Sequence, residues 1–292
     1  MRLKYDCDCM KRPSFFTLFL NHADAWQVAL TIATLVLLIH QTVTFNTMLL
    51  LVAVGLGYWL GFAVNDFFDA PIDAQNAQKA MRNFFVGSTI RSETVRLVFG
   101  LASLGLFVVF ALFGLVGLLF LLLAYLAMWA YSAPPLRLKN RPGYDLLMHV
   151  LFVQTFPYVM TLTLIQGKWT GLDAAIVLLL LLASLTAQLE QQARDFEVDQ
   201  QDGRNFTTLL GYKTAVYVVR GITAVLIGAA FVFVITGVIP WFVLPFGLIG
   251  LPALLHRFFR SEETPRSEGL VLFSTTAGLL YTGVIFFYFL LR

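Results

Sequence analysis

Charged residues are scarce in this sequence. Asp, Glu, Lys and Arg make up only 13% of the 292 residues, whereas hydrophobic residues make up 59% and include 28 Phe. With a mean hydropathy of +0.78, this composition argues against a soluble protein and is typical of a polytopic membrane protein, because roughly 20 apolar residues are needed to cross the hydrocarbon core. The formal net charge of +3 is therefore no indication of nucleic-acid binding, and we attribute it to loops that face anionic lipid.

Cysteine is nearly absent as well. Cys7 and Cys9 lie in a polar N-terminal tail, too close together for an ordinary disulfide and too few for a structural zinc site, so we interpret them as reduced tail cysteines. Residues 1–14 carry charges of both signs, and no apolar segment with a small-residue cleavage site follows at the spacing of a signal peptide. We expect no cleavage.

Several functional signatures are missing too. The sequence has no Gly-rich phosphate loop, nucleophile elbow or haem motif. Its four histidines are scattered without the spacing of metal ligands, and we interpret all of them as structural or interfacial. They are His22, His40, His149 and His256.

Long apolar runs dominate what is present. They predict an all-α polytopic membrane protein with nine transmembrane helices. The run over 94–132 is almost two membrane thicknesses long as one helix, so we divide it near Gly114 to Gly117. The predicted spans are 25–41, 45–64, 94–112, 115–132, 145–166, 172–192, 214–235, 238–255 and 269–290.

Basic residues predict the orientation. With the N-terminus in the cytoplasm, every Lys and Arg except Lys168 and Arg292 falls in an inner loop or an adjoining helix end, which is a strong positive-inside bias. We therefore expect an integral protein of the cell inner or plasma membrane, with a single domain over 1–292 that comprises a cytoplasmic segment, 1–20, and a nine-helix part, 21–292. A binding site belongs on the cytoplasmic side, where the long polar connections lie: 65–93, 133–144, 193–213 and 256–268.

The second predicted span leads into an acidic segment, Asn65 to Asp73, which we call the first acidic motif. On a helix, Asp66, Asp69 and Asp73 share one face, because they are spaced i, i+3 and i+7. Three adjacent carboxylates would repel one another, so this face is expected to bind cations. Ligand sets made only of oxygen favour hard ions, above all Mg²⁺ when phosphate is a co-ligand.

A second acidic motif, Gln191 to Gly203, ends the sixth predicted span. Asp195, Asp199 and Asp202 again have the spacing of one helical face. Each motif closes the second helix of a four-helix block, so the spans indicate two parallel four-helix blocks plus one helix. Carboxylates at a helix C-terminus also oppose the helix dipole, by about 0.3–1 kcal/mol each, and a bound cation would remove that penalty.

Basic side chains lie near both motifs. Two acidic faces for Mg²⁺ with Lys and Arg around them suit a diphosphate, because metals bridge phosphate oxygens and basic residues neutralise charge as pyrophosphate departs. A lipid tail on that diphosphate would explain why membrane helices carry the site. The basic residues are Lys79, Arg82, Arg91, Arg137, Lys139, Arg141, Arg194 and Arg204.

These motifs resemble those of the UbiA superfamily of intramembrane prenyltransferases. The first motif matches the family pattern Asn-Asp-x-x-Asp-x-x-x-Asp, and the second matches Asp-x-x-x-Asp-x-x-x-Gly followed by Thr and Leu-Gly. The loop between the fourth and fifth helices and an Arg-Pro pair before the first helix match as well. The matching residues are Arg12-Pro13, Asn65, Asp66, Asp69, Asp73, Tyr131 to Lys139, Arg141-Pro142-Gly143, Asp195, Asp199, Gly203, Thr207 or Thr208, and Leu210-Gly211.

The resemblance implies nine helices around a central cavity that opens sideways to lipid. It also implies that two Mg²⁺ hold a polyprenyl diphosphate between the motifs, that the C1–O bond ionises, and that the allylic cation alkylates an acceptor. The implied metal ligands are Asn65, Asp66, Asp69, Asp195 and Asp199, with Asp73 and Asp202 completing the cofactor cluster. The implied diphosphate ligands are Lys79, Arg82, Arg137, Lys139 and Arg194. The implied catalytic residues are Asp66, Asp69, Tyr131, Arg137, Lys139, Asp195 and Asp199.

One segment departs from the family. After the first motif the family often has Arg-Pro-Leu-x-x-Gly, where this chain has Asn83 in place of the proline. In the family that loop helps to cover the active site, so the acceptor is not fixed by the motifs. An aromatic quinone precursor is our default acceptor, and a carotenoid end or a glyceryl phosphate lipid is an alternative.

Two other reactions stay open. In a terpene cyclase of the same family, the cation is quenched within its own chain, and ionisation needs the same metals. A cation transporter is a more distant alternative, because acids inside a membrane also mark ion pathways. Transport sites usually lie near the midplane, whereas these acids all lie at inner helix ends.

Overall fold

The computed structural model describes the chain except at its N-terminus, at its last residue and in five short gaps. The tail residues Cys7, Cys9, Arg12 and Pro13 lie outside the described residues. Within these residues the protein is all helical, as predicted, and has no strand. The described residues are 18–20, 22–75, 77–88, 90–202, 205–261 and 266–291.

Eight helices of the described chain are long and apolar enough to cross a membrane. A further apolar helix, α2 (Ala23–Ile39), has 17 residues, so the count of nine spans stays a prediction. The division of the run 94–132 into two helices is confirmed. The eight are α3 (Phe45–Asp73), α5 (Ser92–Ala111), α6 (Gly114–Ser132), Tyr144–Leu164, α9 (Gly171–Arg194), α12 (Tyr212–Ile235), Trp241–Phe259 and Glu268–Tyr288.

Three of these spans have finer structure. Tyr144–Leu164 consists of α7 (Tyr144–His149), the π-helix η2 (Val150–Thr155) and α8 (Phe156–Leu164). Trp241–Phe259 joins the 3₁₀ turn η3 (Trp241–Val243) to α13 (Leu244–Phe259), and Glu268–Tyr288 lies within α14 (Glu268–Leu290). A π-helix of this length inside an α-helix is rare and frequently marks a functional site.

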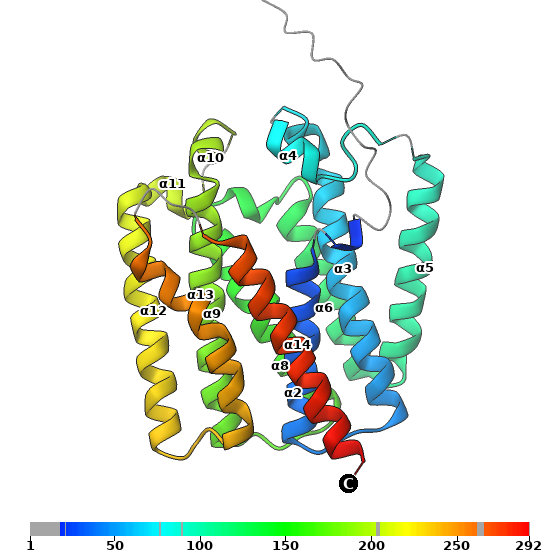
Figure 1. Cartoon of the computed structure of the whole chain (residues 1–292). Helices are drawn as coiled ribbons and strands as arrows, with labels where there is room; N and C mark the ends of the chain where they lie inside the picture. Colours follow the sequence, from blue (N-terminus) through cyan, green and yellow to red (C-terminus); the bar gives the residue numbers. More distant parts are fainter. Residues whose placement is uncertain are drawn as a thin grey trace, which may run out of the picture.

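The short helices gather at one end of the bundle. In Figure 1, α4 (Ala77–Arg82), α10 (Phe196–Asp202) and α11 (Phe206–Leu210) lie at the end opposite the C-terminus of α14. The 3₁₀ turn η1 (Leu138–Asn140) follows α6. Both acidic motifs end at this side of the bundle. The polar connections therefore lie together at the end where the sequence analysis predicts the site.

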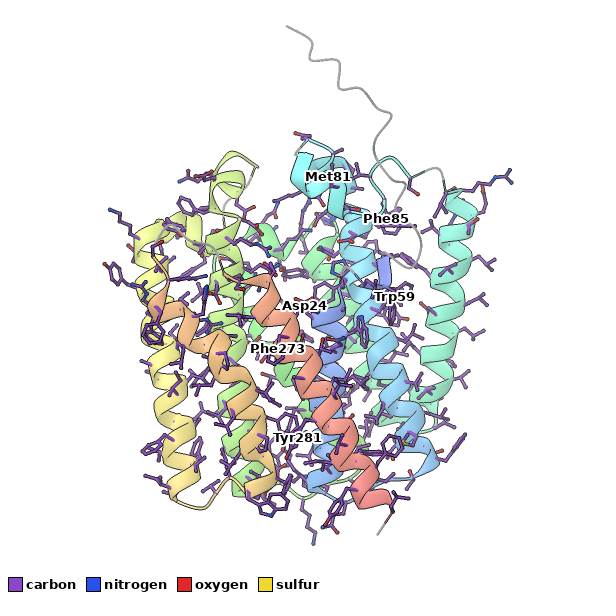
Figure 2. The ribbon with its side chains drawn as sticks, in the orientation of Figure 1. Asp24, Trp59, Met81, Phe85, Phe273 and Tyr281 are labelled. Atoms are coloured by element: carbon purple, nitrogen blue, oxygen red, sulfur yellow. The ribbon has the colours of Figure 1, made fainter. Side chains whose placement is uncertain are left out.

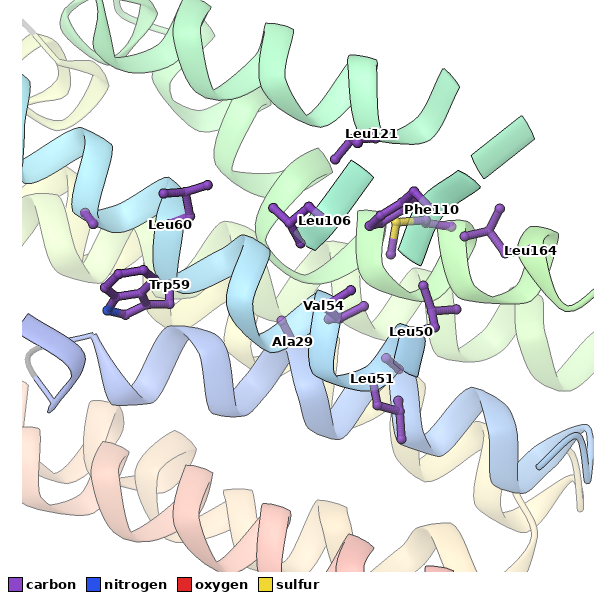
Figure 3. Close-up of a cluster of buried hydrophobic side chains, with 14 of the residues drawn as sticks. Ala29, Leu50, Leu51, Val54, Trp59, Leu60, Leu106, Phe110, Leu121 and Leu164 are labelled. Carbon is purple, nitrogen blue, oxygen red and sulfur yellow. The ribbon is translucent and has the colours of Figure 1, made fainter. Parts of the chain in front are cut away.

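A large hydrophobic cluster joins the helices of the first half. Figure 3 shows its buried side chains, with Leu50 and Val54 of α3 close to Leu106 and Phe110 of α5. The helix α2 packs against α3, α8 and α14, whereas α9 packs against η2 and α12. Together these contacts leave room for a cavity between α3, α6, the α7–η2 segment and α9, which is described below.

The outer surface of the bundle is apolar. Large side chains such as Leu97 and Phe231 are exposed. Phe273 is exposed too, whereas Trp59 is buried; both are labelled in Figure 2. A helical surface of this kind is stable in lipid, since the backbone polar groups are satisfied inside each helix. The protein is therefore an integral membrane protein.

A buried carboxylate stabilises the end of the bundle that lies away from the short helices. Asp173 is fully buried, and its Oδ2 accepts hydrogen bonds from the backbone nitrogen of Thr170 at 2.7 Å and from the Thr170 hydroxyl at 2.6 Å. Its Oδ1 accepts from the Tyr158 hydroxyl at 2.7 Å and lies 2.9 Å from Nε2 of His40. The structural role that we predicted for His40 fits this arrangement.

Candidate active site

A cavity of about 410 Å³ lies among α3, α5, α6, α7, η2, α8 and α9. That volume is within the usual range for small-molecule sites. Along α3 the lining runs from Ala53 to Asp73, which at 1.5 Å per residue is about 30 Å. The cavity is thus deep and narrow, and it follows one membrane helix toward its acidic end.

The lining changes character along this length. We call the end at the acidic motifs the polar mouth and the remainder the apolar depth. The mouth is lined by Asn65, Asp69, Asp73, Lys79, Arg137, Lys139, Asp195 and Asp199. The depth includes Val54, Leu106, Phe110, Leu121, Phe152 and Met160.

The first acidic motif is helical throughout, because α3 continues to Asp73 instead of ending near residue 64. Asp69 forms the centre of the mouth. Its carboxylate accepts a hydrogen bond from Arg137 at 2.7 Å and another from Lys139. Lys139 also donates to Oδ1 of Asn65 at 2.8 Å. The predicted convergence of these four residues is therefore present.

The loop after α6 delivers the two basic residues. Arg137 adopts a left-handed backbone conformation with φ of 39°, which costs a non-glycine residue on the order of 1–3 kcal/mol and persists only where the surroundings enforce it. Ser132, the last residue of α6, donates to Oδ1 of Asn65 at 3.1 Å and so fixes the start of this loop against α3. Burial lowers the pKa of Lys139 from its ordinary value, and the adjacent Asp69 carboxylate opposes this effect.

Asp66 does not share the position of Asp69. Its carboxylate is buried and does not line the cavity; Oδ2 lies 2.8 Å from Nε2 of His22, at the start of α2. The i, i+3 and i+7 spacing spreads the three carboxylates over an arc of the helix, and Asp66 is at the edge that faces α2. Asp69 and Asp73 line the mouth. The predicted role of Asp66 as a metal ligand stays a prediction, and the geometry gives it a supporting position.

Asn83, the residue that replaces the family's proline, ties the loop after α4 to α3. Its side chain is buried and donates to Oδ2 of Asp73 and to the backbone carbonyl of Asp66, both at 2.8 Å. Its Oδ1 accepts from the backbone nitrogen of Phe85 at 2.9 Å. Proline could make none of these contacts, so the substitution has a structural purpose in this chain.

Replacing Asn83 with alanine is expected to lower the free energy of unfolding by about 1–3 kcal/mol, because buried polar groups of Asp66, Asp73 and Phe85 would lose their partner. Thermal unfolding in detergent would measure the loss. Gln75→Ala is the matched control, since Gln75 is exposed and makes one long contact of 3.4 Å to Pro71. Equal thermal unfolding midpoints for Asn83→Ala and Gln75→Ala would show that the hydrogen bonds of Asn83 contribute no stability.

The second acidic motif is divided between two helices. Asp195 ends α9, and its backbone carbonyl accepts from the nitrogen of Asp199 at 2.9 Å, so the helical spacing continues into α10. Oδ1 of Asp199 accepts from Lys79 at 3.3 Å and its Oδ2 from Asn205 at 2.7 Å. Burial raises the pKa of Asp199 from its ordinary value, and Lys79 opposes the shift. Through Lys79, α4 connects the two motifs.

At the end of α9, Arg194 pairs with two carboxylates. It donates to both carboxylate oxygens of Asp195, at 2.9 and 2.8 Å, and to Glu268 at the start of α14. Arg194 does not line the cavity, whereas Tyr131 does. The phosphate contact of Arg194 stays a prediction. The side chains of Arg82 and Asp202 lie outside what the structure describes.

The donor set of the mouth suits a hard cation. Within the described chain, no three His, Cys, Asp or Glu side chains converge on one point as a complete metal cage. The carboxylates of Asp69, Asp195 and Asp199 are held by basic side chains instead. Mg²⁺ commonly takes one or two carboxylates together with water and substrate phosphate, and these oxygen ligands meet that requirement.

Three contributors to the site carry no signal in the sequence. His22 reaches Asp66 from a position 44 residues away, and Asn205 reaches Asp199 as the N-cap of α11. His149, which we interpreted as structural or interfacial, lines the cavity. Each partner is set by packing between elements, so spacing along the chain could not reveal it.

Comparison with known proteins identifies the family. A family model described as the UbiA prenyltransferase family matches residues 28–276. No curated protein sequence matches the chain. A UbiA homologue from Archaeoglobus fulgidus, solved with GPP and Mg²⁺, superimposes with a TM-score of 0.71 at 18% identity, covering 92% of this chain and 99% of that one.

Two further solved structures share the fold. The apo structure of a UbiA homologue from Aeropyrum pernix K1 has a TM-score of 0.67 at 16% identity, covering 89% of this chain and 95% of that chain. A structure of digeranylgeranylglyceryl phosphate synthase has a TM-score of 0.59 at 12% identity, covering 94% and 97%. The family match, which spans most of the membrane helices, shows that the chain belongs to the UbiA prenyltransferase family and is a membrane-embedded prenyltransferase.

Proposed function

We propose that the protein is a Mg²⁺-dependent enzyme that transfers the prenyl group of a polyprenyl diphosphate to a hydrophobic acceptor, an aromatic quinone precursor by default, with release of pyrophosphate. The observation that carries this proposal is the division of one cavity into a polar mouth and an apolar depth. Carboxylates and basic side chains of the mouth suit a metal-bound diphosphate. The depth suits a hydrocarbon chain.

Metal binding is assigned to oxygen ligands from both motifs. Asn65 and Asp69 are one turn apart on α3, and Asp195 and Asp199 have the same spacing across α9 and α10. We propose that these four hold Mg²⁺, two ions in all, with Asp73 and Asp202 in support. The bound metal would supply charge stabilisation to the departing pyrophosphate.

The basic residues of the mouth hold the diphosphate in this scheme. Arg137 and Lys139 contact Asp69, and Lys79 contacts Asp199, so all three are positioned at the carboxylates where phosphate oxygens would arrive. They neutralise the charge that develops as the C1–O bond breaks. Tyr131 lines the wall beside them, and the apolar depth keeps water from the allylic cation.

The finer topology is also a proposal. We propose nine transmembrane helices in two four-helix blocks plus α14, with α2 as the first span and with the chain forming one domain. The N-terminus and the polar mouth face the cytoplasm. What supports this orientation is the basic character of the connections at the mouth, where Arg137, Lys139 and Lys79 lie.

Purified protein in detergent is expected to release pyrophosphate from geranyl diphosphate when Mg²⁺ is present. Chelation with EDTA should abolish the release and added Mg²⁺ should restore it, because ionisation needs the charge that the metal supplies. Coupled measurement of pyrophosphate tests this. Release at the same rate in EDTA would refute the metal assignment. Mass spectrometry of the prenyl products then separates an alkylated acceptor from a cyclic hydrocarbon or alcohol.

A further inference from the structure

A histidine lies on the wall of the cavity, below the polar mouth. His149 is the last residue of α7 and lines the cavity with Met148 and Phe152. One helical turn nearer the mouth, Oδ2 of Asp145 accepts from Gln192 of α9 at 2.6 Å. His149 is thus one turn deeper than the polar network that joins α7 to α9, at the upper edge of the apolar depth.

The hydrogen bonds of His149 determine which ring nitrogen carries the proton. Nδ1 lies 3.2 Å from Oγ of Ser184 on α9. The same Oγ donates its single hydrogen to the backbone carbonyl of His149 at 3.1 Å. With that hydrogen on the carbonyl, Oγ accepts the bond from the ring; in this arrangement Nδ1 carries the hydrogen of the neutral imidazole and Nε2 keeps a free lone pair.

That lone pair has no protein partner. Nε2 makes no hydrogen bond to any residue of the described chain, although the side chain lines a cavity. Elsewhere on the wall of the same cavity, the hydroxyl of Tyr125 on α6 is buried and also has no partner within the described chain. Unpaired polar atoms inside an apolar site cost free energy unless a ligand satisfies them, so this part of the wall is suited to a ligand that carries polar groups.

The wall around His149 is held in an unusual conformation. The π-helix η2 begins directly after it, and the carbonyl of Phe152 accepts a hydrogen bond from the Tyr58 hydroxyl of α3. This bond satisfies a carbonyl of η2 from across the cavity and thereby fixes the wall to the helix that carries the first acidic motif. The ring of His149 is itself held by Ser184 of α9.

We propose that His149 is the catalytic base of the transfer, an inference that rests on the proposed function. The C1–O bond of the donor breaks and its electron pair leaves with pyrophosphate. A π-electron pair of the acceptor forms the new bond to C1. The acceptor then carries a positive charge and loses a proton, whose bond pair restores the neutral product, and Nε2 of His149 takes that proton.

Other groups of the cavity are less suited to this step. All four lining carboxylates lie in the mouth, away from His149, and are assigned to the metal cluster. Basic residues pair with Asp69, Asp195 and Asp199, and Asn83 donates to Asp73. Tyr58 donates its hydroxyl hydrogen to Phe152. Among side chains, neutral imidazole is the most frequent general base.

The test separates ionisation of the donor from transfer. Full-length protein in detergent receives Mg²⁺, radiolabelled geranyl diphosphate, and a total lipid extract of the producing cells as the pool of acceptors. Pyrophosphate release and labelled products are measured together for wild type, H149Q and H149F. The control is H256Q, since His256 lies on α13 outside the cavity. S184A keeps the imidazole and removes the group that fixes its tautomer.

In H149Q and H149F the labelled transfer product is expected to fall about 100-fold or more, which is the usual contribution of a general base. Pyrophosphate release should stay within about threefold of wild type. The label should appear in prenyl alcohol instead of the transfer product. S184A should fall less, and H256Q should match wild type. Unchanged transfer in H149Q, or an equal fall of release and transfer, would overturn the assignment. Wild type that ionises the donor but yields only prenyl alcohol would overturn it as well. Absence of pyrophosphate release in wild type would instead refute the proposed function itself.

Discussion

Asp69→Ala is expected to reduce pyrophosphate release from geranyl diphosphate by about 10³-fold, the scale of losing one preorganised electrostatic partner in an active site. Asp69 lies between the two basic residues of the α6 loop and contacts both Arg137 and Lys139. Its loss would remove a proposed metal ligand and would also leave the two basic side chains without the carboxylate that positions them. The initial rate with saturating Mg²⁺ measures the effect.

Two variants separate chemistry from folding. Asp69→Asn keeps the size of the side chain and should lose nearly as much activity, while its unfolding temperature stays close to that of wild type. Glu93→Gln is the control for removing a carboxylate, because Glu93 is exposed and lies 4.0 Å from Arg96. Wild-type activity in Asp69→Asn at all Mg²⁺ concentrations would show that Asp69 is no metal ligand.

Glu190→Ala is expected to cause the largest loss of stability, about 3–5 kcal/mol, because it leaves buried positive charge without a partner. Glu190 is 5% exposed and joins two arginines: Arg257 donates to Oε2 at 2.8 Å, and Arg260 lies 2.7 Å from Oε1. Arg257 also donates to Thr223 at 3.0 Å. The cluster therefore connects α9, α12 and the end of α13.

Thermal and denaturant unfolding in detergent would measure this loss. Glu93→Ala again supplies the comparison, since an exposed ion pair contributes at most about 1 kcal/mol. Glu190 is outside the cavity, so the folded fraction of Glu190→Ala should keep its activity per molecule at low temperature. A midpoint shift no larger than that of Glu93→Ala would show that the buried cluster contributes no net stability.

Most of the fold could be predicted from the sequence because a bilayer imposes a length and a polarity on each helix. The predicted spans coincide with helices throughout, and Gly114, with φ of 67°, begins α6 where we divided the long run. The ends of several spans differ by a few residues, and two features of the helices were not predicted. The helix α3 runs nine residues past its predicted end, because the apolar run ends before Asn65 while the helical hydrogen bonds continue to Asp73. Hydropathy also could not reveal that α7 and α8 are joined by a π-helix.

The site was predictable only where spacing along one helix determines position. The i, i+3 and i+7 spacing placed Asp66, Asp69 and Asp73 on one face, and the basic loops supplied Arg137 and Lys139 as candidates. The family resemblance added Asn65 as a ligand and gave the basic residues their role. Contacts between elements that are distant in the sequence could not be predicted in this way. Arg194 pairs with Glu268, 74 residues later, and Asp66 pairs with His22. A local pattern could not foresee either partner, because only the packed bundle brings them together.

The contrast between the polar mouth and the apolar depth bears on why the proposed reaction would run in one direction. Its two products differ in solubility: pyrophosphate partitions into water, whereas a prenylated molecule partitions into lipid. In the proposed reaction the mouth, lined by Lys79 and Asp199, would offer the first a polar exit, and the depth beside Phe110 and Leu121 would hold the second. The reverse reaction would require pyrophosphate to return from water and the prenylated product to return from lipid to the same cavity. The shape of the cavity therefore adds a kinetic separation of products to the chemistry of the site.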